Sequence, residues 1–149
     1  MADTFILEVV TPARQVVNES ANEAQIPVLG GYIGVLPGHT PLLAEMGIGE
    51  LSFQAGNRVF FCTAIGGFVE VLADRVIVLA DAAERAEEIN VARAEAALAR
   101  AQKRLAAPND PTVDWKRAGE ALKRAQVRLR VGAKAGASSV VTSSGSAPH

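Results

Sequence analysis

The chain has 149 residues and a formal net charge of −1, and hydrophobic residues make up 49% of it and aromatic residues 5%. This length fits one domain or a small domain with an appendage, and its core must be mostly aliphatic. The nearly neutral charge excludes a uniformly basic nucleic-acid binder, and one cysteine excludes an internal disulfide framework or a multi-thiolate metal site.

Charge and composition divide the chain near residue 80. Residues 1–80 have three basic and eight acidic side chains, a balance of −5, whereas residues 81–149 have twelve and eight, a balance of +4. All five phenylalanines and the only tyrosine lie in the first part, and alanine dominates the second. Such different chemistry suggests two structural units.

The first part is typical of β structure. Short β-branched and apolar runs alternate with turn residues such as Thr11-Pro12, Gly56-Asn57 and Gly66-Gly67. Short strands separated by such frequent turns predict an antiparallel β-sandwich or a barrel. The expected strands cover residues 4–10, a short one from 16, 24–29, 32–36, 51–53, 58–64, 68–72 and 75–79.

The second part predicts two helices, because apolar residues recur at heptad-like spacing. The two seams are Val91, Ala94, Leu98, Ala101 and Leu105, then Trp115, Ala118, Leu122, Ala125 and Leu129. The short link between them makes the helices antiparallel neighbours, so we expect a helical hairpin. Alanine at every second seam position lets the two axes approach closely.

The helix ends carry recognisable signals. The first helix has two candidate starts, a capping box of Asp81 with Glu84 or a cap at Asn90. We expect Pro108 to end it, and Asp110 to cap a second helix whose first position is Pro111.

The expected organisation is a sandwich over residues 1–84, a hairpin over 85–131 and a disordered tail over 132–149. The tail is rich in serine, alanine and glycine and has little apolar surface to bury. Each helix has only two or three large apolar seam residues, so the hairpin must pack against the sandwich or a partner to be stable. A hairpin with two supports is a natural two-state element.

No catalytic constellation or metal site is expected. His39 lies in a Pro-Gly-His-Thr-Pro turn, where it could be a base or a hydrogen-bonded loop histidine, and no nucleophile motif accompanies it. The glycine-rich residues 30–34 lack the P-loop pattern. Cys62 is expected to be a small buried hydrophobe. The uncharged run 24–44 contains prolines and glycines that break a helix, so no membrane span is expected. Since a secretory n-region and a disulfide framework are both missing, the chain is predicted to be intracellular.

The basic residues of the second part recur on related helix faces. Arg93 and Arg100 are seven residues apart, and Arg124 and Arg128 are four apart. Guanidinium groups gathered in this way bind phosphates or carboxylates, and the alternative is a solvated helix face.

Three blocks of sequence are distinctive. They are Gly34-Val35-Leu36-Pro37-Gly38-His39-Thr40-Pro41-Leu42-Leu43, Gly66-Gly67-Phe68-Val69-Glu70-Val71 and Val76-Ile77-Val78-Leu79-Ala80-Asp81. With these blocks the chain resembles, over residues 4–131, the epsilon-subunit family of F-type ATP synthases.

The resemblance implies a β-sandwich followed by a helical hairpin, in a subunit of the central rotor stalk that performs no chemistry itself. Its expected partners are the gamma subunit and the c-subunit ring through the sandwich, and the alpha/beta hexamer through the hairpin. The subunit would couple proton translocation to ATP synthesis and inhibit ATP hydrolysis. It would lie at the cytoplasmic face of the inner membrane and associate with the membrane only through the complex. No nucleic-acid partner is expected.

The resemblance also implies a nucleotide-binding motif, because some bacterial members bind regulatory ATP through the hairpin; no other cofactor is expected. Their I/L-D-x-x-R-A motif matches Ile89, Arg93 and Ala94, with Asn90 in place of the aspartate. Later arginines of the motif match Arg100, Arg124 and Arg128.

Candidate partner-contact residues are Tyr32, His39, Leu42 and Leu43, on the proline-glycine loop; the alternative places both leucines in the core. Two other functions stay open from the residues alone. One is a free-standing β-sandwich that binds a small ligand under a helical lid, and the other is a nucleic-acid adaptor that uses the basic second helix.

Overall fold

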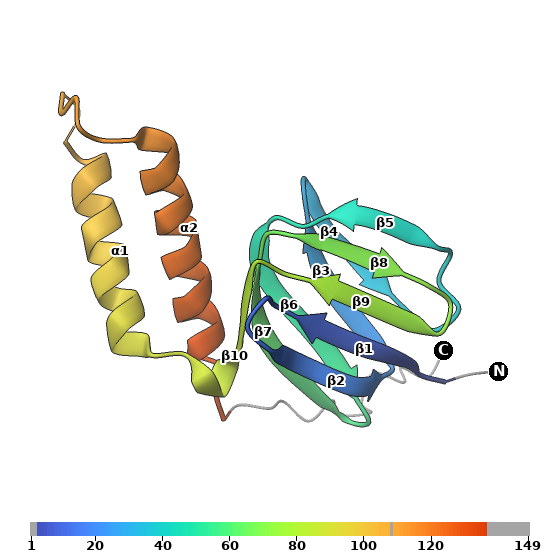
Figure 1. Ribbon diagram of the computed structural model, residues 1–149. Coiled ribbons are helices and arrows are strands. Elements are labelled where there is room, and N and C mark those ends of the chain that lie inside the picture. Colours follow the sequence, from blue (N-terminus) through green and yellow to red (C-terminus); the bar gives the residue numbers. More distant parts are fainter. Residues whose placement is uncertain (1–2, 108, 137–149) are drawn as a thin grey trace, which may run out of the picture.

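The computed structural model describes residues 3–107 and 109–136. These residues form ten strands, one turn of 3-10 helix and two α-helices (Figure 1). The strands are β1 (Phe5–Val10), β2 (Gln15–Ala21), β3 (Glu23–Val28), β4 (Gly31–Val35), β5 (Leu42–Glu45), β6 (Ile48–Ala55), β7 (Arg58–Ile65), β8 (Phe68–Val71), β9 (Arg75–Leu79) and β10 (Ala82–Arg85). The helical elements are η1 (Ala86–Glu88), α1 (Val91–Leu105) and α2 (Trp115–Gly132).

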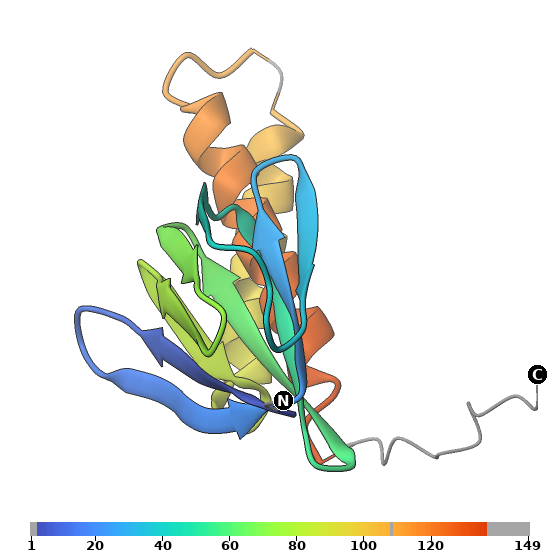
Figure 2. The same ribbon diagram turned by 90° about the vertical axis from the view of Figure 1, so that its right-hand side faces the viewer.

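The strands form two five-stranded sheets that face each other, as Figure 2 shows, so the predicted sandwich is confirmed. The first sheet has the order β2-β1-β9-β8-β5 and the second β10-β7-β6-β3-β4. Neighbouring strands are antiparallel except β1 and β9, which run parallel. That one pair departs from the expected all-antiparallel arrangement.

The core between the sheets is mostly aliphatic, as the composition predicts, with Phe5 and Phe53 as its buried aromatic residues. In β1, Phe5, Leu7 and Val9 are buried and alternate with half-buried residues, which is the period-two pattern of a strand with one inner face. Cys62 is fully buried in β7, as expected. Burial raises the pKa of its thiol to about 12, which keeps it protonated.

Two strands are absent from the sequence-based prediction. The β5 strand has four residues, follows Pro41 and lies at a sheet edge. The β10 strand, which pairs with β7, has two alanines as its only apolar residues. Because β10 occupies the predicted Asp81–Glu84 capping box, that candidate start of the first helix is wrong; α1 begins after Asn90.

The predicted start of the second helix is also wrong. The Asp110 carboxylate accepts hydrogen bonds from the backbone N–H and the hydroxyl of Thr112, so it closes a local turn instead of capping a helix. The Asp114 side chain accepts from the Arg117 backbone N–H and caps α2. Pro108, the predicted stop of the first helix, lies outside the described residues, as do residues 137–149 of the predicted tail.

The alanines of the two seams are buried where α1 and α2 meet, whereas the terminal seam residues Val91 and Trp115 are 41% and 43% exposed. The buried alanines are Ala94, Ala101, Ala118 and Ala125. Small side chains therefore form the contact and allow the close approach of the axes. Among the described residues, no helix combines the length and hydrophobicity that crossing a bilayer requires.

A small apolar cluster at the base of the hairpin joins it to the sandwich. Its buried members are Ala86, Ile89, Val127 and Val131, and Ile48 and Phe61 pack against them from the second sheet. Val127 and Val131 lie outside the predicted seam, because α2 has one face toward α1 and another toward the sheet. The hairpin extends well beyond this base (Figure 1).

Candidate functional site

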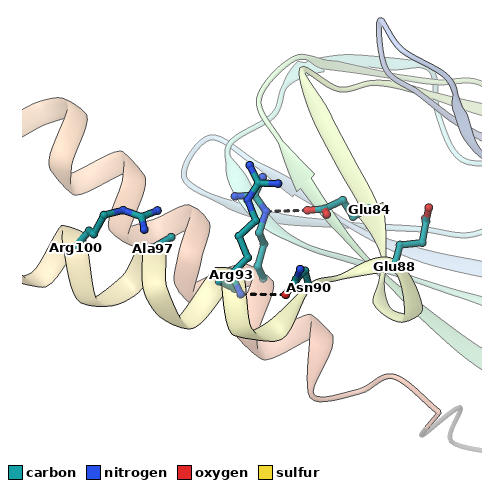
Figure 3. Close-up of a pocket in the computed structure, with 8 residues that line it drawn as sticks. Glu84, Glu88, Asn90, Arg93, Ala97 and Arg100 are labelled. Carbon is teal, nitrogen blue, oxygen red and sulfur yellow. Dashed lines mark hydrogen bonds and ion pairs between the residues drawn. The ribbon is translucent and has the colours of Figure 1, made fainter.

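A pocket of about 380 Å³ lies where the linker before α1 meets the two helices (Figure 3). Residues from both parts of the chain line it. The strand β10 and the turn η1 each contribute one glutamate, α2 contributes one arginine, and the other lining residues lie in α1 or cap its N-terminus. The lining residues are Glu84, Glu88, Asn90, Arg93, Ala94, Ala97, Arg100 and Arg128.

Five of the seven residues that resemble a nucleotide motif line this pocket: Asn90, Arg93, Ala94, Arg100 and Arg128. The other two do not line it. Ile89 is buried in the apolar cluster at the hairpin base, and Arg124 lies elsewhere on α2.

The sequence-based prediction did not include three lining residues, Glu84, Glu88 and Ala97. Glu84 lies in the unpredicted strand β10, and Glu88 lies in η1. Ala97 falls three residues after Ala94 on the same helical face, so the helical period was the signal that would have found it.

Asn90 has a structural role in this site. Its side-chain oxygen accepts a hydrogen bond from the Arg93 backbone N–H at 3.0 Å, and this bond caps α1 (Figure 3). Since an amide oxygen has two lone pairs, it keeps one for a ligand.

The charges of the pocket are partly neutralised. Arg128 Nε donates to the Glu84 carboxylate at 2.7 Å, and Glu88 pairs with Arg14 of the β1–β2 turn at 2.6 Å. The hydrogen bond from Arg14 holds the pKa of the Glu88 carboxyl below its ordinary value. Within residues 3–107 and 109–136, Arg93 and Arg100 make no ion pair, so their guanidinium groups are free for an anion.

The candidate partner-contact residues lie at one end of the sandwich, where β4 and β5 are the edge strands of the two sheets. Tyr32 of β4 is 54% exposed and Leu43 of β5 is 69% exposed. Leu42 is 39% exposed, so the alternative that both leucines belong to the core is wrong. Further exposed apolar residues of the sandwich are Leu29, Leu36, Phe68 and Leu79.

His39 is the one candidate partner-contact residue that lies in the loop between these edge strands. Its Nδ1 is 2.6 Å from the backbone oxygen of Thr40, which fits the predicted hydrogen-bonded loop histidine. Among the described residues, no group of three or more His, Cys, Asp or Glu side chains is arranged to hold a metal ion.

Two family models match the chain in succession. Residues 4–86 match "ATP synthase, Delta/Epsilon chain, beta-sandwich domain", and residues 87–132 match "ATP synthase, Delta/Epsilon chain, long alpha-helix domain". Both structural parts therefore match one family, the delta/epsilon chains of ATP synthases.

Individual relatives agree with the family models. The chain is 50% identical to the ATP synthase epsilon chain of Solibacter usitatus, over 87% of this chain and 96% of the relative. It is 43% identical to ATP synthase epsilon chain 2 of Syntrophotalea carbinolica, over 91% and 99%. The chain belongs to this family, as an epsilon subunit of F-type ATP synthase.

A solved structure shares the fold. A chain in the cryo-EM structure of the Euglena gracilis mitochondrial ATP synthase, comprising OSCP, F1 and the c-ring, superposes with a TM-score of 0.74 at 22% identity. The match covers 87% of this chain and 81% of that one. At this identity the likeness concerns the fold alone.

Proposed function

We propose that the sandwich attaches this chain to the gamma subunit and the c-subunit ring of the central stalk, and that the hairpin restrains ATP hydrolysis at the alpha/beta hexamer. The subunit performs no chemistry itself. In this proposal it couples proton translocation to ATP synthesis at the cytoplasmic face of the inner membrane and associates with the membrane only through the complex.

The observation that carries the proposal is that the sandwich is firmly packed whereas the hairpin is attached to it through a small contact. The sandwich has a continuous, mostly aliphatic core and an apolar end that is exposed, around Tyr32, Leu42 and Leu43. Exposed apolar side chains clustered on one end of a domain are typical of a protein interface. The hairpin, in contrast, is held to the sandwich by four buried side chains and two ion pairs, Arg128 with Glu84 and Lys134 with Glu50, so we expect it to detach at modest cost.

Co-purification tests the attachment. The full chain should capture gamma and the c-ring, and Leu43→Glu should weaken capture because it places a charge in the proposed contact. The matched control is Gln15→Glu, which adds the same charge at β2, the opposite edge of the same sheet. Equal capture by the two variants would contradict the assignment of this end. A stable monomer with a bound small ligand would favour the lidded sandwich instead.

We also propose that the pocket binds ATP as a regulatory ligand. Arg93 and Arg100 are free to take phosphate oxygens, and Arg128 can join them by leaving Glu84. Such a ligand would bridge α1 and α2 at the base of the hairpin. Because it binds the docked hairpin better than the detached one, it would stabilise the docked form.

Isothermal titration of the full chain with ATP tests this second proposal. We expect binding that Arg100→Ala weakens and Arg130→Ala leaves unchanged, since Arg130 is exposed on α2 and does not line the pocket. No heat at millimolar ATP, or equal loss in the two variants, would contradict it.

A further inference from the structure

One cross-strand row on the outer face of the second sheet contacts the hairpin at two points. We call it the docking row, and it comprises Tyr32 (β4), Pro27 (β3), Glu50 (β6), Thr63 (β7) and Glu84 (β10). Tyr32 pairs with Pro27, and Thr63 pairs with both Glu50 and Glu84, in the strand register. The Tyr32–Pro27 pair meets β6 at Gly49 and Glu50, where the Tyr32 hydroxyl accepts the Glu50 backbone N–H and a Cβ at residue 49 would touch Pro27.

Both carboxylates of the docking row hold the end of α2. Glu84 accepts from Arg128 Nε at 2.7 Å, and Glu50 pairs with Lys134 Nζ, just beyond the helix. Lys134 follows Arg128 by six positions, which is a rise of about 9 Å at helical spacing. Two strand spacings separate the two carboxylates, which is about 9.6 Å. The end of α2 therefore runs along the row, across the strands.

The Glu50 contact is the more enclosed of the two. The Glu50 side chain is only 14% exposed, against 30% for that of Glu84. Lys134 Nζ also lies 4.5 Å from the centroid of the Phe61 ring, so the ammonium has a cation–π contact beside its carboxylate.

The backbone of Glu50 depends on Tyr32. Pro27 is a poor ladder partner because it has no N–H, and the recorded β3–β6 pairs end before it. The hydroxyl of Tyr32 instead accepts the Glu50 backbone N–H at 3.3 Å. Gly49 leaves room for the Tyr32 side chain, since a Cβ at residue 49 would lie 2.9 Å from the Tyr32 hydroxyl oxygen and 2.6 Å from Pro27 Cβ.

We propose that Glu50 links the exposed edge strand β4 to the hairpin. In this link the Tyr32 hydroxyl positions Glu50 for Lys134, so loss of this hydrogen bond loosens the docking of α2. The link is a property of the isolated chain.

A double-mutant cycle on the full isolated chain tests the link, with hydrogen exchange of the α2 amides as the readout. The variants are Tyr32→Phe, Lys134→Met and the pair together. Tyr32→Phe keeps the ring and removes one hydrogen bond, so we expect roughly two- to fivefold faster exchange near the C-terminal end of α2. In the Lys134→Met background the same change should add nothing further.

The Glu84 contact supplies the matched control. In the Arg128→Met background, where Glu50 keeps Lys134, Tyr32→Phe should retain its full effect. Equal effects of Tyr32→Phe in the Lys134→Met and Arg128→Met backgrounds, or no effect in the unmodified chain, would overturn the proposal.

A general disturbance of the sheet by Tyr32→Phe would appear as lost protection in β6. A second cycle therefore tests the role of Glu50 without changing Tyr32. It pairs Glu50→Gln with Lys134→Met, because glutamine keeps the shape and backbone of Glu50. Each single change alone should speed exchange in α2 as much as the two changes together. Additive effects in this cycle would equally overturn the role of Glu50.

Discussion

Val131→Ala probes how weakly the hairpin is attached. Val131 is fully buried and is one of the four buried side chains that hold the hairpin to the sandwich. The substitution removes two carbons worth about 0.8 kcal/mol each, and incomplete closure of the cavity brings the total to about 2 kcal/mol. Since 1.4 kcal/mol is a factor of ten, the docking equilibrium should shift about 30-fold.

Hydrogen exchange of the full chain, followed peptide by peptide, measures this shift. Exchange in α2 should accelerate by about 30-fold, while the sandwich strands keep their protection. Val91→Ala is the matched control, because it makes the same chemical change in a helical residue that is 41% exposed. The gain in helix propensity from valine to alanine is then common to both variants.

Two results would refute the reasoning. If the sandwich strands lost protection in step with α2, the chain would be one cooperative unit without a separable hairpin. If Val131→Ala and Val91→Ala accelerated exchange equally, the apolar cluster would not be the anchor.

Three further predictions concern single residues. Gly119→Ala should stabilise α2 by about 0.5–1 kcal/mol, because a Cβ there meets open space and glycine is a poor helix former; slower exchange in α2 would show it, and no change would contradict it. Cys62 should react with a disulfide reagent at neutral pH only as fast as the sandwich opens, given its burial and a pKa near 12, and rapid labelling of the folded chain would contradict this. The pKa of Glu88 is lowered by Arg14, so its contribution to stability is present above the unfolded pKa and is lost as the pH falls through the folded value; acid denaturation of Glu88→Gln should therefore lack this component, and identical acid transitions would contradict it.

Most of the sandwich was predictable because its strands bury alternate aliphatic residues between clear turn signals. The exceptions were β5 and β10. Leu42 and Leu43 of β5 are exposed at a sheet edge, and β10 has only alanine as its apolar residue. Neither strand shows the burial pattern by which a strand is recognised in a sequence.

The helix starts show where local signals compete. Asp110 followed by Pro111 has the composition of a helix start, yet Thr112 offers two donors that hold the aspartate in a local turn. Asp114 then caps the helix. Both aspartates are good caps, and the choice between them depends on a turn that sequence patterns do not distinguish.

The candidate pocket was predictable on its α1 side, where Asn90, Arg93 and Arg100 follow a motif. Its acidic side was not. Glu84 reaches the pocket only because β10 pairs with β7 and α2 brings Arg128 to it. These contacts join Glu84 to Thr63, 21 positions away, and to Arg128, 44 positions away. Tertiary contacts of this kind leave no periodic trace in the sequence.

The central claim is that this chain restrains ATP hydrolysis through its hairpin while the sandwich holds it in the synthase. The most direct measurement is the ATP hydrolysis rate of the complex reconstituted with the full chain or with a chain that ends at residue 86. We expect both chains to be retained in the complex and the truncated one to give faster hydrolysis. Equal rates, with both chains retained in the complex, would contradict the claim.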